Sequence, residues 1–106
     1  MTTRKSSGSS GVELARKLLG GPLSMGAALA GLRDLHGLTQ VELARRVGMS
    51  RQHICYIEKH RRFVSPAKAP EIAKRLGYPE AYFVKLALQD IINHDGLKYK
   101  VNVEAA

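Results

Sequence analysis

The stretch that decides the fold is TQVELARRVGMSRQHICYIE, which spans residues 39–58. Thr39 and Glu42 have the spacing of a capping box, in which the threonine hydroxyl accepts from the N3 amide and the N3 carboxylate accepts from the N-cap amide. The helix that begins there is expected to end at Gly48, because glycine tolerates the left-handed conformation that commonly follows a helix. Ser50 is a typical N-cap residue and predicts a second helix a few residues later. The pattern therefore predicts two short helices joined by a tight turn.

The second helix is expected to run from Arg51 to about Lys59, and its two sides differ in chemistry. At 3.6 residues per turn, Ile54, Ile57 and Glu58 share one side. The opposite side and the first turn carry a guanidinium, a carboxamide, a phenol and an ammonium, which belong to Arg51, Gln52, Tyr56 and Lys59. These groups hydrogen-bond to base edges and phosphates, so a DNA-reading surface is one interpretation. An ordinary solvated surface is the other, and this helix alone does not decide between them.

Three further helices are expected around this pair. The first has apolar residues at three- and four-residue spacing and ends before a glycine, and the other two begin at prolines, which suit the first turn of a helix. Their expected ranges are Ser24 to His36, Pro66 or Pro70 to Leu76, and Pro79 to about His94. With the central pair they form an all-α bundle of five helices.

The two ends of the chain differ from this helical centre. Residues 1–11 are polar and glycine-rich and are expected to form a flexible arm, followed by a short helix from Val12 to Leu19. In the last segment, residues 95–106, apolar and polar side chains alternate from Leu97 to Val103, which is the period of a β-strand.

A single strand cannot pair its own backbone groups, and no other strand pattern exists in the chain. We therefore expect this C-terminal strand to pair with the same strand of a second copy, while residues 12–94 form the helical domain that carries the candidate DNA-binding surface. The residues expected at the dimer contact are Tyr82, Leu97, Tyr99, Val101 and Val103.

The composition limits the classes of protein to which the chain can belong. Its 106 residues suffice for one domain, and 44% hydrophobic and 25% charged residues are typical of a soluble globular protein. It has no apolar run of membrane-helix length, and its one cysteine, Cys55, cannot form an internal disulfide. No acidic pair, phosphate loop or metal-ligand spacing indicates catalysis, a cofactor or a metal site. We therefore expect a soluble, cytoplasmic protein that is not an enzyme and has no membrane partner.

The net charge indicates the kind of partner. Seventeen Lys and Arg residues against nine Asp and Glu residues leave a formal net charge of +8. Most of the excess lies between Arg45 and Arg75, a segment with nine basic and two acidic residues. Charge concentrated in one third of a chain favours a binding surface for a polyanion over an evenly solvated surface.

The central stretch resembles the helix-turn-helix regulators of the phage repressor and Cro type, also called the xenobiotic response element family. The resemblance runs from about Leu29 to Tyr82 and is most specific in Arg33, Gly37–Gln40, Glu42–Ala44, Val47–Ser50 and Ile54–Glu58. It implies a compact bundle like that of the lambda repressor, whose third helix enters the major groove of DNA while the second crosses the backbone. It also implies a structural ion pair between Arg33 and Glu58. The chain departs from the family after Glu58, where Lys59-His60-Arg61-Arg62 replaces the usual glycine or small polar residue.

The resemblance and the charge pattern together assign DNA contacts to a group of nine residues. Arg51, Gln52 and Tyr56 match base-facing positions, and Gln40 and His53 match positions at the DNA backbone. The basic residues that follow the third helix are expected to hold phosphates. The full group is Gln40, Ser50, Arg51, Gln52, His53, Tyr56, Lys59, Arg61 and Arg62.

We interpret the chain as a repressor that binds double-stranded DNA as a homodimer and reads an inverted repeat. The extra material at both ends leaves a second interpretation open, an antitoxin that neutralises a toxin protein and represses its own operon. A third is an adaptor that uses this fold for protein contacts alone. Salt-dependent DNA binding separates the first two from the third.

Overall fold

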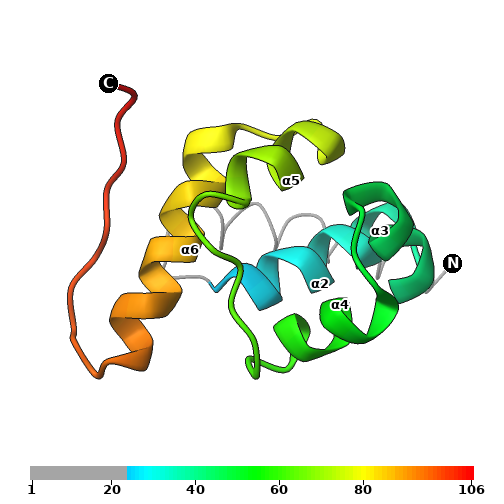
Figure 1. Cartoon of the computed structure of the whole chain (residues 1–106), viewed down its shortest axis with the longest axis horizontal. Coiled ribbons are helices and arrows are strands. Elements are labelled where there is room, and N and C mark those ends of the chain that lie inside the picture. The colour runs from blue at the N-terminus through cyan, green and yellow to red at the C-terminus, as the bar shows by residue number, and fades with distance from the viewer. Residues whose placement is uncertain (1–23) are drawn as a thin grey trace, which may run out of the picture.

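The computed structural model describes residues 24–106, so the expected arm at residues 1–11 and the expected helix from Val12 to Leu19 lie outside the described part. The described part contains five helices: α2 (Met25–His36), α3 (Gln40–Val47), α4 (Arg51–Glu58), α5 (Ala69–Leu76) and α6 (Glu80–His94). Figure 1 shows α2 crossing the middle of the bundle between α5 above and α4 below, with α3 at one end and α6 at the other. α5 also packs against α3. The predicted bundle of five helices is confirmed. None of these helices is long and apolar enough to span a membrane.

The helices of the central pair begin and end where the sequence predicts. Thr39 and Glu42 form the expected capping box, with the Thr39 Oγ1 accepting from the Glu42 amide at 3.1 Å and the Glu42 Oε1 accepting from the Thr39 amide at 2.8 Å. Gly48 ends α3 with a left-handed φ of 74°, a conformation that L side chains rarely adopt. Side-chain and backbone preferences therefore set the length of α3 locally.

The core is a single cluster to which every helix contributes. Its largest fully buried side chains come from α2, α3, α4, α5 and α6 and are Met25, Leu29, Leu43, Val47, Ile54, Ile57, Ile72, Phe83 and Leu86. Both isoleucines of α4 lie in this cluster, on the side that the helical period assigns to them. Burial of that side fixes the rotation of α4, so its other residues face outward.

The backbones of α2 and α4 approach each other closely at Gly26. A Cβ atom built at Gly26 would overlap the backbone carbonyl oxygen of Ile57. Glycine usually weakens a helix interior, but here it is the residue that lets α4 pack directly against α2. The position of the C-terminal end of α4 depends on this contact.

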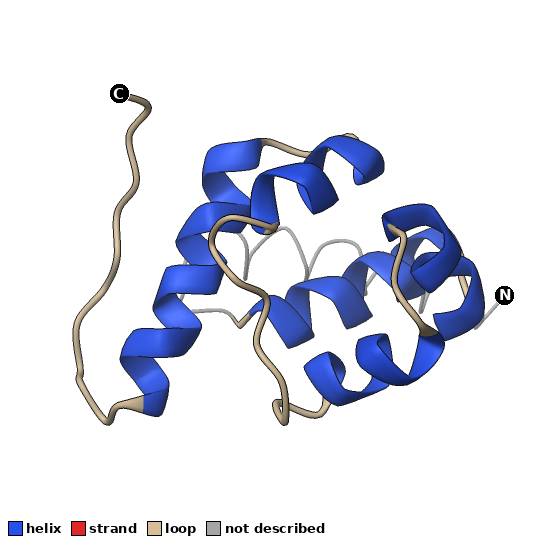
Figure 2. Ribbon diagram, in the orientation of Figure 1, coloured by secondary structure: helices blue, strands red, loops and turns tan. Residues whose placement is uncertain are grey.

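The prediction of a C-terminal β-strand is wrong. Within residues 24–106 the chain forms no strand, and Leu97 to Val103 run as an extended segment that doubles back beside α6 (Figure 2). The side chain of Gln89 on α6 pairs with this segment: its Nε2 donates to the Tyr99 carbonyl and its Oε1 accepts from the Val101 amide, both at 2.8 Å. A side-chain amide thus satisfies two of the backbone groups that a neighbouring strand was expected to pair.

The residues assigned to the dimer contact are distributed over different environments. Tyr99 and Leu97 are 71% and 45% exposed. Val101 and Val103 are half-buried, and Tyr82 is half-buried against the core. Only Val101 and Val103 are partly covered, so the alternation of apolar and polar residues marks an extended segment without marking a strand or a continuous buried side.

Candidate nucleic-acid interface

The N-terminal end of α4 is fixed by its cap. Ser50 has an extended backbone, and its Oγ accepts from the His53 amide at 3.1 Å. The preceding turn is closed by a hydrogen bond from the Met49 amide to the Ala44 carbonyl at 2.9 Å. As a result, Arg51 and Gln52 occupy the first turn of α4 and are both exposed.

The exposed side of α4 carries side chains that contact one another. Gln52 and Tyr56 lie one turn apart, and the Gln52 Nε2 donates to the Tyr56 hydroxyl at 3.0 Å. The Arg62 guanidinium lies over the Tyr56 ring, with its central carbon 5.8 Å from the ring centre. A shallow cavity of about 180 Å³ is lined by Ser50, Gln52, His53, Tyr56 and Arg62. The polar groups of this surface are therefore held in one cluster before any partner binds.

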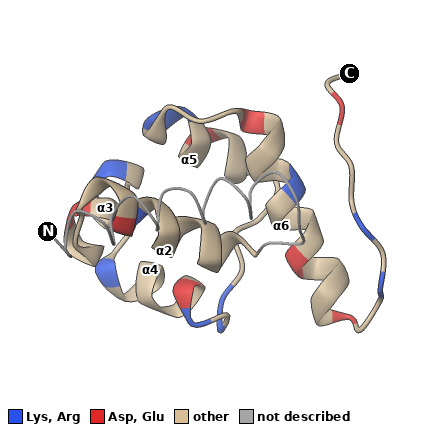
Figure 3. Ribbon diagram, turned by 180° about the vertical axis from the view of Figure 1, so that it is seen from behind, with Lys and Arg blue, Asp and Glu red and all other residues tan. Residues whose placement is uncertain are grey.

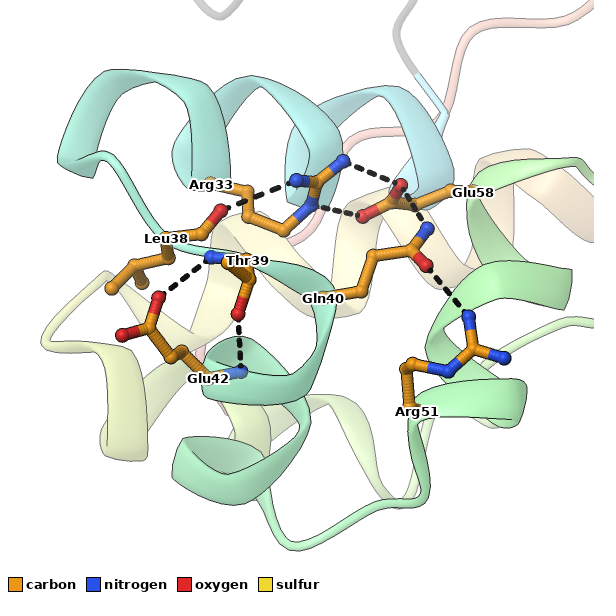
Figure 4. A network of polar contacts seen from close by, with 7 residues as sticks. All are labelled: Arg33, Leu38, Thr39, Gln40, Glu42, Arg51 and Glu58. Atoms are coloured by element: carbon orange, nitrogen blue, oxygen red, sulfur yellow. Dashed lines mark hydrogen bonds and ion pairs between the residues drawn. The ribbon is translucent and has the colours of Figure 1, made fainter.

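A polar network ties α2, α3 and α4 together behind this surface (Figure 4). Arg33 on α2 donates twice to Glu58 at the end of α4, from Nε to Oε2 at 2.9 Å and from Nη2 to Oε1 at 3.1 Å. A third bond runs from the Arg33 Nη1 to the Leu38 carbonyl at 3.2 Å, in the connection between α2 and α3. The Arg33 guanidinium thus joins α2, the connection between α2 and α3, and the end of α4.

The network reaches the exposed surface through Gln40. Its Nε2 donates to the Glu58 Oε1 at 3.0 Å, and its Oε1 accepts from the Arg51 Nη1 at 3.3 Å. The side-chain amide of Gln40 therefore links the Arg33–Glu58 ion pair to the guanidinium of Arg51. Because Glu58 is engaged by Arg33 and Gln40, its charge is largely compensated, and the charge of Arg51 remains available to an outside partner.

Two pKa shifts follow from these contacts. The hydrogen bond to Glu58 and the charge of that carboxylate raise the pKa of Arg33, although burial works in the other direction. The hydrogen bonds from Thr39 hold the pKa of Glu42 below its usual value. Both groups therefore favour their charged forms.

The loop that follows α4 is strongly basic, and Figure 3 shows its Lys and Arg residues next to the end of that helix. The Arg61 amide donates to the Tyr56 carbonyl at 2.8 Å and the His60 amide to the Ile57 carbonyl at 3.0 Å, which is the Schellman pattern. His60 holds the left-handed position of this motif with a φ of 60°, where glycine is the usual residue. The residues after α4 thus differ from the family pattern, but the turn still has the Schellman hydrogen bonds.

The structure brings most of the nine predicted DNA-contacting residues to one surface. Five of them line the shallow cavity described above, and two more, Gln40 and Arg51, are joined to each other beside it. Lys59 and Arg61 are exposed in the loop and do not line this cavity.

Sequence reasoning missed the contacts that hold this surface together. The pairing of Gln52 with Tyr56 could have been anticipated, because side chains four residues apart on a helix are neighbours. The link from Gln40 to Glu58 and the stacking of Arg62 on Tyr56 had no such signal, since both depend on how the loop and helices pack.

Comparison with known proteins agrees with this geometry. A family model described as helix-turn-helix matches residues 29–83, which is just over half of the chain. No curated protein and no solved structure matched the chain in the corresponding searches. The matched segment begins in α2 and ends in α6, so it contains the whole polar network and the surface that the network supports. The chain belongs to the helix-turn-helix family of the Cro and repressor type, whose members are DNA-binding transcriptional regulators and not enzymes.

Proposed function

We propose that this regulator is a repressor that reads an inverted-repeat operator in double-stranded DNA as a homodimer. The observation that carries the proposal is the cluster of Arg51, Gln52 and Tyr56 on the exposed side of α4, supported from behind by the Gln40–Glu58–Arg33 network. A surface held in one arrangement before binding loses less conformational freedom when it binds.

Direct reading of bases is assigned to two residues in the first turn of α4. Arg51 has the donor fork that fits O6 and N7 of guanine, and Gln52 has the donor and acceptor that fit N6 and N7 of adenine. Each such pair contributes about 1–3 kcal/mol of discrimination against a wrong base. The Tyr56 hydroxyl, which accepts from Gln52 at 3.0 Å, orients that amide toward the groove.

Phosphate contacts are assigned to residues on either side of the reading surface. Gln40 lies at the start of α3, where its side chain and the helix N-terminus both favour a phosphate oxygen. Lys59, Arg61 and Arg62 follow α4 and supply positive charge on the other side. These contacts would set the register of α4 on the duplex without reading its sequence.

A homodimer would place two copies of α4 on successive turns of one face of DNA, about 34 Å apart. Support for a second copy comes from apolar side chains that remain exposed on α6 and on the extended segment after it, namely Ile91, Leu97 and Tyr99. Exposed apolar side chains gathered at one end of a small domain favour a protein contact. Strand pairing has no part in this contact.

The test is selection of bound duplexes from a random library at two salt concentrations, with the molecular mass measured by sedimentation. An inverted repeat recovered by a dimer supports the proposal. Enrichment without a motif, or a monomer that binds a single half-site, contradicts it.

Two variants separate reading from anchoring. Gln52→Ala is expected to lose preference at one base position, because it removes the adenine contact. Arg61→Ala is expected to weaken all sequences alike and to lower the salt slope by about one unit, because it removes one phosphate contact. Equal weakening by both variants, without any change in preference, would show that the two roles are wrongly assigned.

A second function, an antitoxin that binds a toxin protein, is favoured by the extended segment after α6. Tyr99 is 71% exposed there, although Gln89 holds its carbonyl and the amide of Val101. A tyrosine presented in this way suits a protein interface. Isolation of the untagged chain from its own cells in a stoichiometric complex with a second protein would favour this role over a stand-alone repressor.

A further inference from the structure

A second cavity, of about 260 Å³, adjoins the C-terminal end of α4. Its walls come from the loop after α4, the start of α2 and the last turns of α6, and they include Ser24, His60, Arg62 and Asp90. It is not part of the reading surface, but one residue, Arg62, lines both this cavity and the shallow one on α4.

The cavity holds two opposite charges that do not neutralise each other. The ion pairs among the described residues are Arg33–Glu58 and Arg75–Glu71, so Asp90 and Arg62 form none with each other or with another residue of this part of the chain. The Asp90 Oδ2 accepts one hydrogen bond, from the Met25 amide at 3.2 Å. Arg62 contacts the face of Tyr56. Each group therefore retains capacity for a ligand of opposite charge.

Asp90 is poorly compensated where it lies. Burial raises the pKa of its carboxyl, while the Met25 amide and the nearby charge of His60 act in the opposite direction without cancelling that effect. A cationic group in the cavity would relieve the cost of holding the ionised carboxylate away from water.

The remaining wall is mixed: Ser24, His60, Asn93 and His94 are polar, and Ile57 and Phe63 supply its apolar part. Ile57 is buried in the core behind the cavity, and Phe63 is 40% exposed at its rim. The Phe63 ring stands edge-to-face on His94, with ring centres 5.1 Å apart. A ligand that reaches both charges would therefore meet an apolar surface between or beside them.

We propose that this cavity binds a small zwitterion of the α-amino-acid type with an apolar side chain. Its ammonium group would pair with Asp90, its carboxylate with Arg62, and its side chain would pack on Phe63. The cavity is slightly smaller than the roughly 300–1,000 Å³ of sites for drug-sized molecules, which suits a ligand of about ten non-hydrogen atoms.

The shared residue makes the site an effector site. A carboxylate bound to Arg62 would draw its guanidinium from Tyr56 and from the phosphate that we assign to it, so the ligand would weaken DNA binding. This part of the inference rests on the proposed function, whereas ligand binding itself does not. Loss of one charge-assisted contact predicts a decrease in DNA affinity of about tenfold.

Binding is tested by NMR titration of the ¹⁵N-labelled full chain with L-phenylalanine at millimolar concentrations. Two derivatives each remove one charge: N-acetyl-L-phenylalanine lacks the ammonium, and L-phenylalaninamide lacks the carboxylate. We expect saturable shifts of amides around the cavity with L-phenylalanine and an affinity at least about tenfold lower for each derivative. No saturable shift at the cavity, or equal binding of either derivative, overturns the proposal.

Variants locate the site. Asp90→Asn keeps an acceptor for the Met25 amide and removes the charge, and Arg62→Met removes the guanidinium from an exposed loop position. Each is expected to reduce L-phenylalanine affinity by about tenfold. Arg61→Met is the matched control, because Arg61 is the neighbouring exposed cation and does not line the cavity. Unchanged affinity in both cavity variants, or an equal loss in the control, overturns the proposal.

The effect on DNA is measured separately, as DNA affinity with and without saturating L-phenylalanine. A decrease in the unmodified chain that disappears in Asp90→Asn supports the effector role, and an unchanged affinity overturns that role. A chain that binds no DNA at all would contradict the proposed function, while the NMR titration would still decide whether the cavity binds its ligand.

Discussion

The two ends of α4 are held in different ways. At its N-terminal end, the turn and the cap come from adjacent residues, with Gly48 in the left-handed conformation and Ser50 accepting from the His53 amide. At its C-terminal end, the contacts come from distant parts of the chain: Gly26 against the Ile57 carbonyl, and Arg33 on Glu58.

The two ends of α4 therefore contribute differently to the stability of the reading surface. A local cap provides a hydrogen-bond acceptor for one backbone amide, whereas a long-range contact fixes the position of the whole helix in the bundle. We therefore expect loss of the long-range contacts at the C-terminal end of α4 to cost more than loss of the cap at its N-terminal end. Three substitutions test this ranking, and a fourth tests the local turn that follows the helix.

The largest effect is expected for Gly26→Ala. The added methyl group overlaps the Ile57 carbonyl, so α2 and α4 must move apart, and the free energy of unfolding should fall by about 3 kcal/mol or more. Alanine would otherwise favour the helix by about 1 kcal/mol. Gly37→Ala is the control: it introduces left-handed strain with no atom within 4 Å and should cost only about 1 kcal/mol. Urea unfolding of both variants gives the comparison, and equal costs would show that the close approach adds nothing.

The next effect is expected for Glu58→Gln, which breaks the ion pair that joins α2 to α4. The side chains of Arg33 and Glu58 are 26% and 9% exposed, so removal of the charge should cost about 2 kcal/mol. The Arg75–Glu71 pair is 47% and 49% exposed, and Glu71→Gln should change stability by about 0.5 kcal/mol or less. A small cost for Glu58→Gln in chemical unfolding would contradict the ranking of the two ends.

Ser50→Ala tests the N-terminal end. It removes the side-chain oxygen that accepts from His53, and the expected cost is about 1 kcal/mol of unfolding free energy. Ser50→Thr keeps a capping hydroxyl and should recover most of the loss. A cost above that of Glu58→Gln in the same unfolding assay would reverse the comparison.

His60→Gly gives the smallest effect and has the opposite sign. His60 has a φ of 60° in the turn that ends α4, and glycine adopts this conformation without the steric cost, so stability should rise by up to about 1 kcal/mol. Lys59→Gly is the control, because Lys59 has a φ of −91° and gains nothing from glycine. A decrease in thermal stability for His60→Gly would mean that the histidine side chain contributes more than its backbone strain costs.

Much of the fold could be predicted from the sequence, since the signals at the helix boundaries are local. The capping box at Thr39, the cap at Ser50 and the glycine at Gly48 act within a few residues and were all readable. The C-terminal segment was predicted wrongly because alternating apolar and polar residues have the period of any extended segment, whether or not that segment pairs with a strand. Only the position of Gln89 beside Tyr99 and Val101 distinguishes this segment from a strand.

The candidate site also has features that the sequence predicts and features that it does not. The outward side of α4 follows from helical geometry once Ile54 and Ile57 are assigned to the core. The connection from Gln40 to Glu58 and the position of Arg62 over Tyr56 do not follow, because they join residues that are neighbours in space only. The second cavity had no sequence signal, since its walls come from α2, α6 and the loop after α4.

Local sequence signals were enough to predict the helices, the turn between α3 and α4 and the residues that face away from the core. These features depend on backbone preferences and on helical periodicity, which act over one or two turns. Only the tertiary structure decided how α4 is seated on α2, what the chain does after α6, and that Arg62 lines two cavities at once. Those features depend on close packing between segments far apart in the chain, and no local pattern encodes the distance between them.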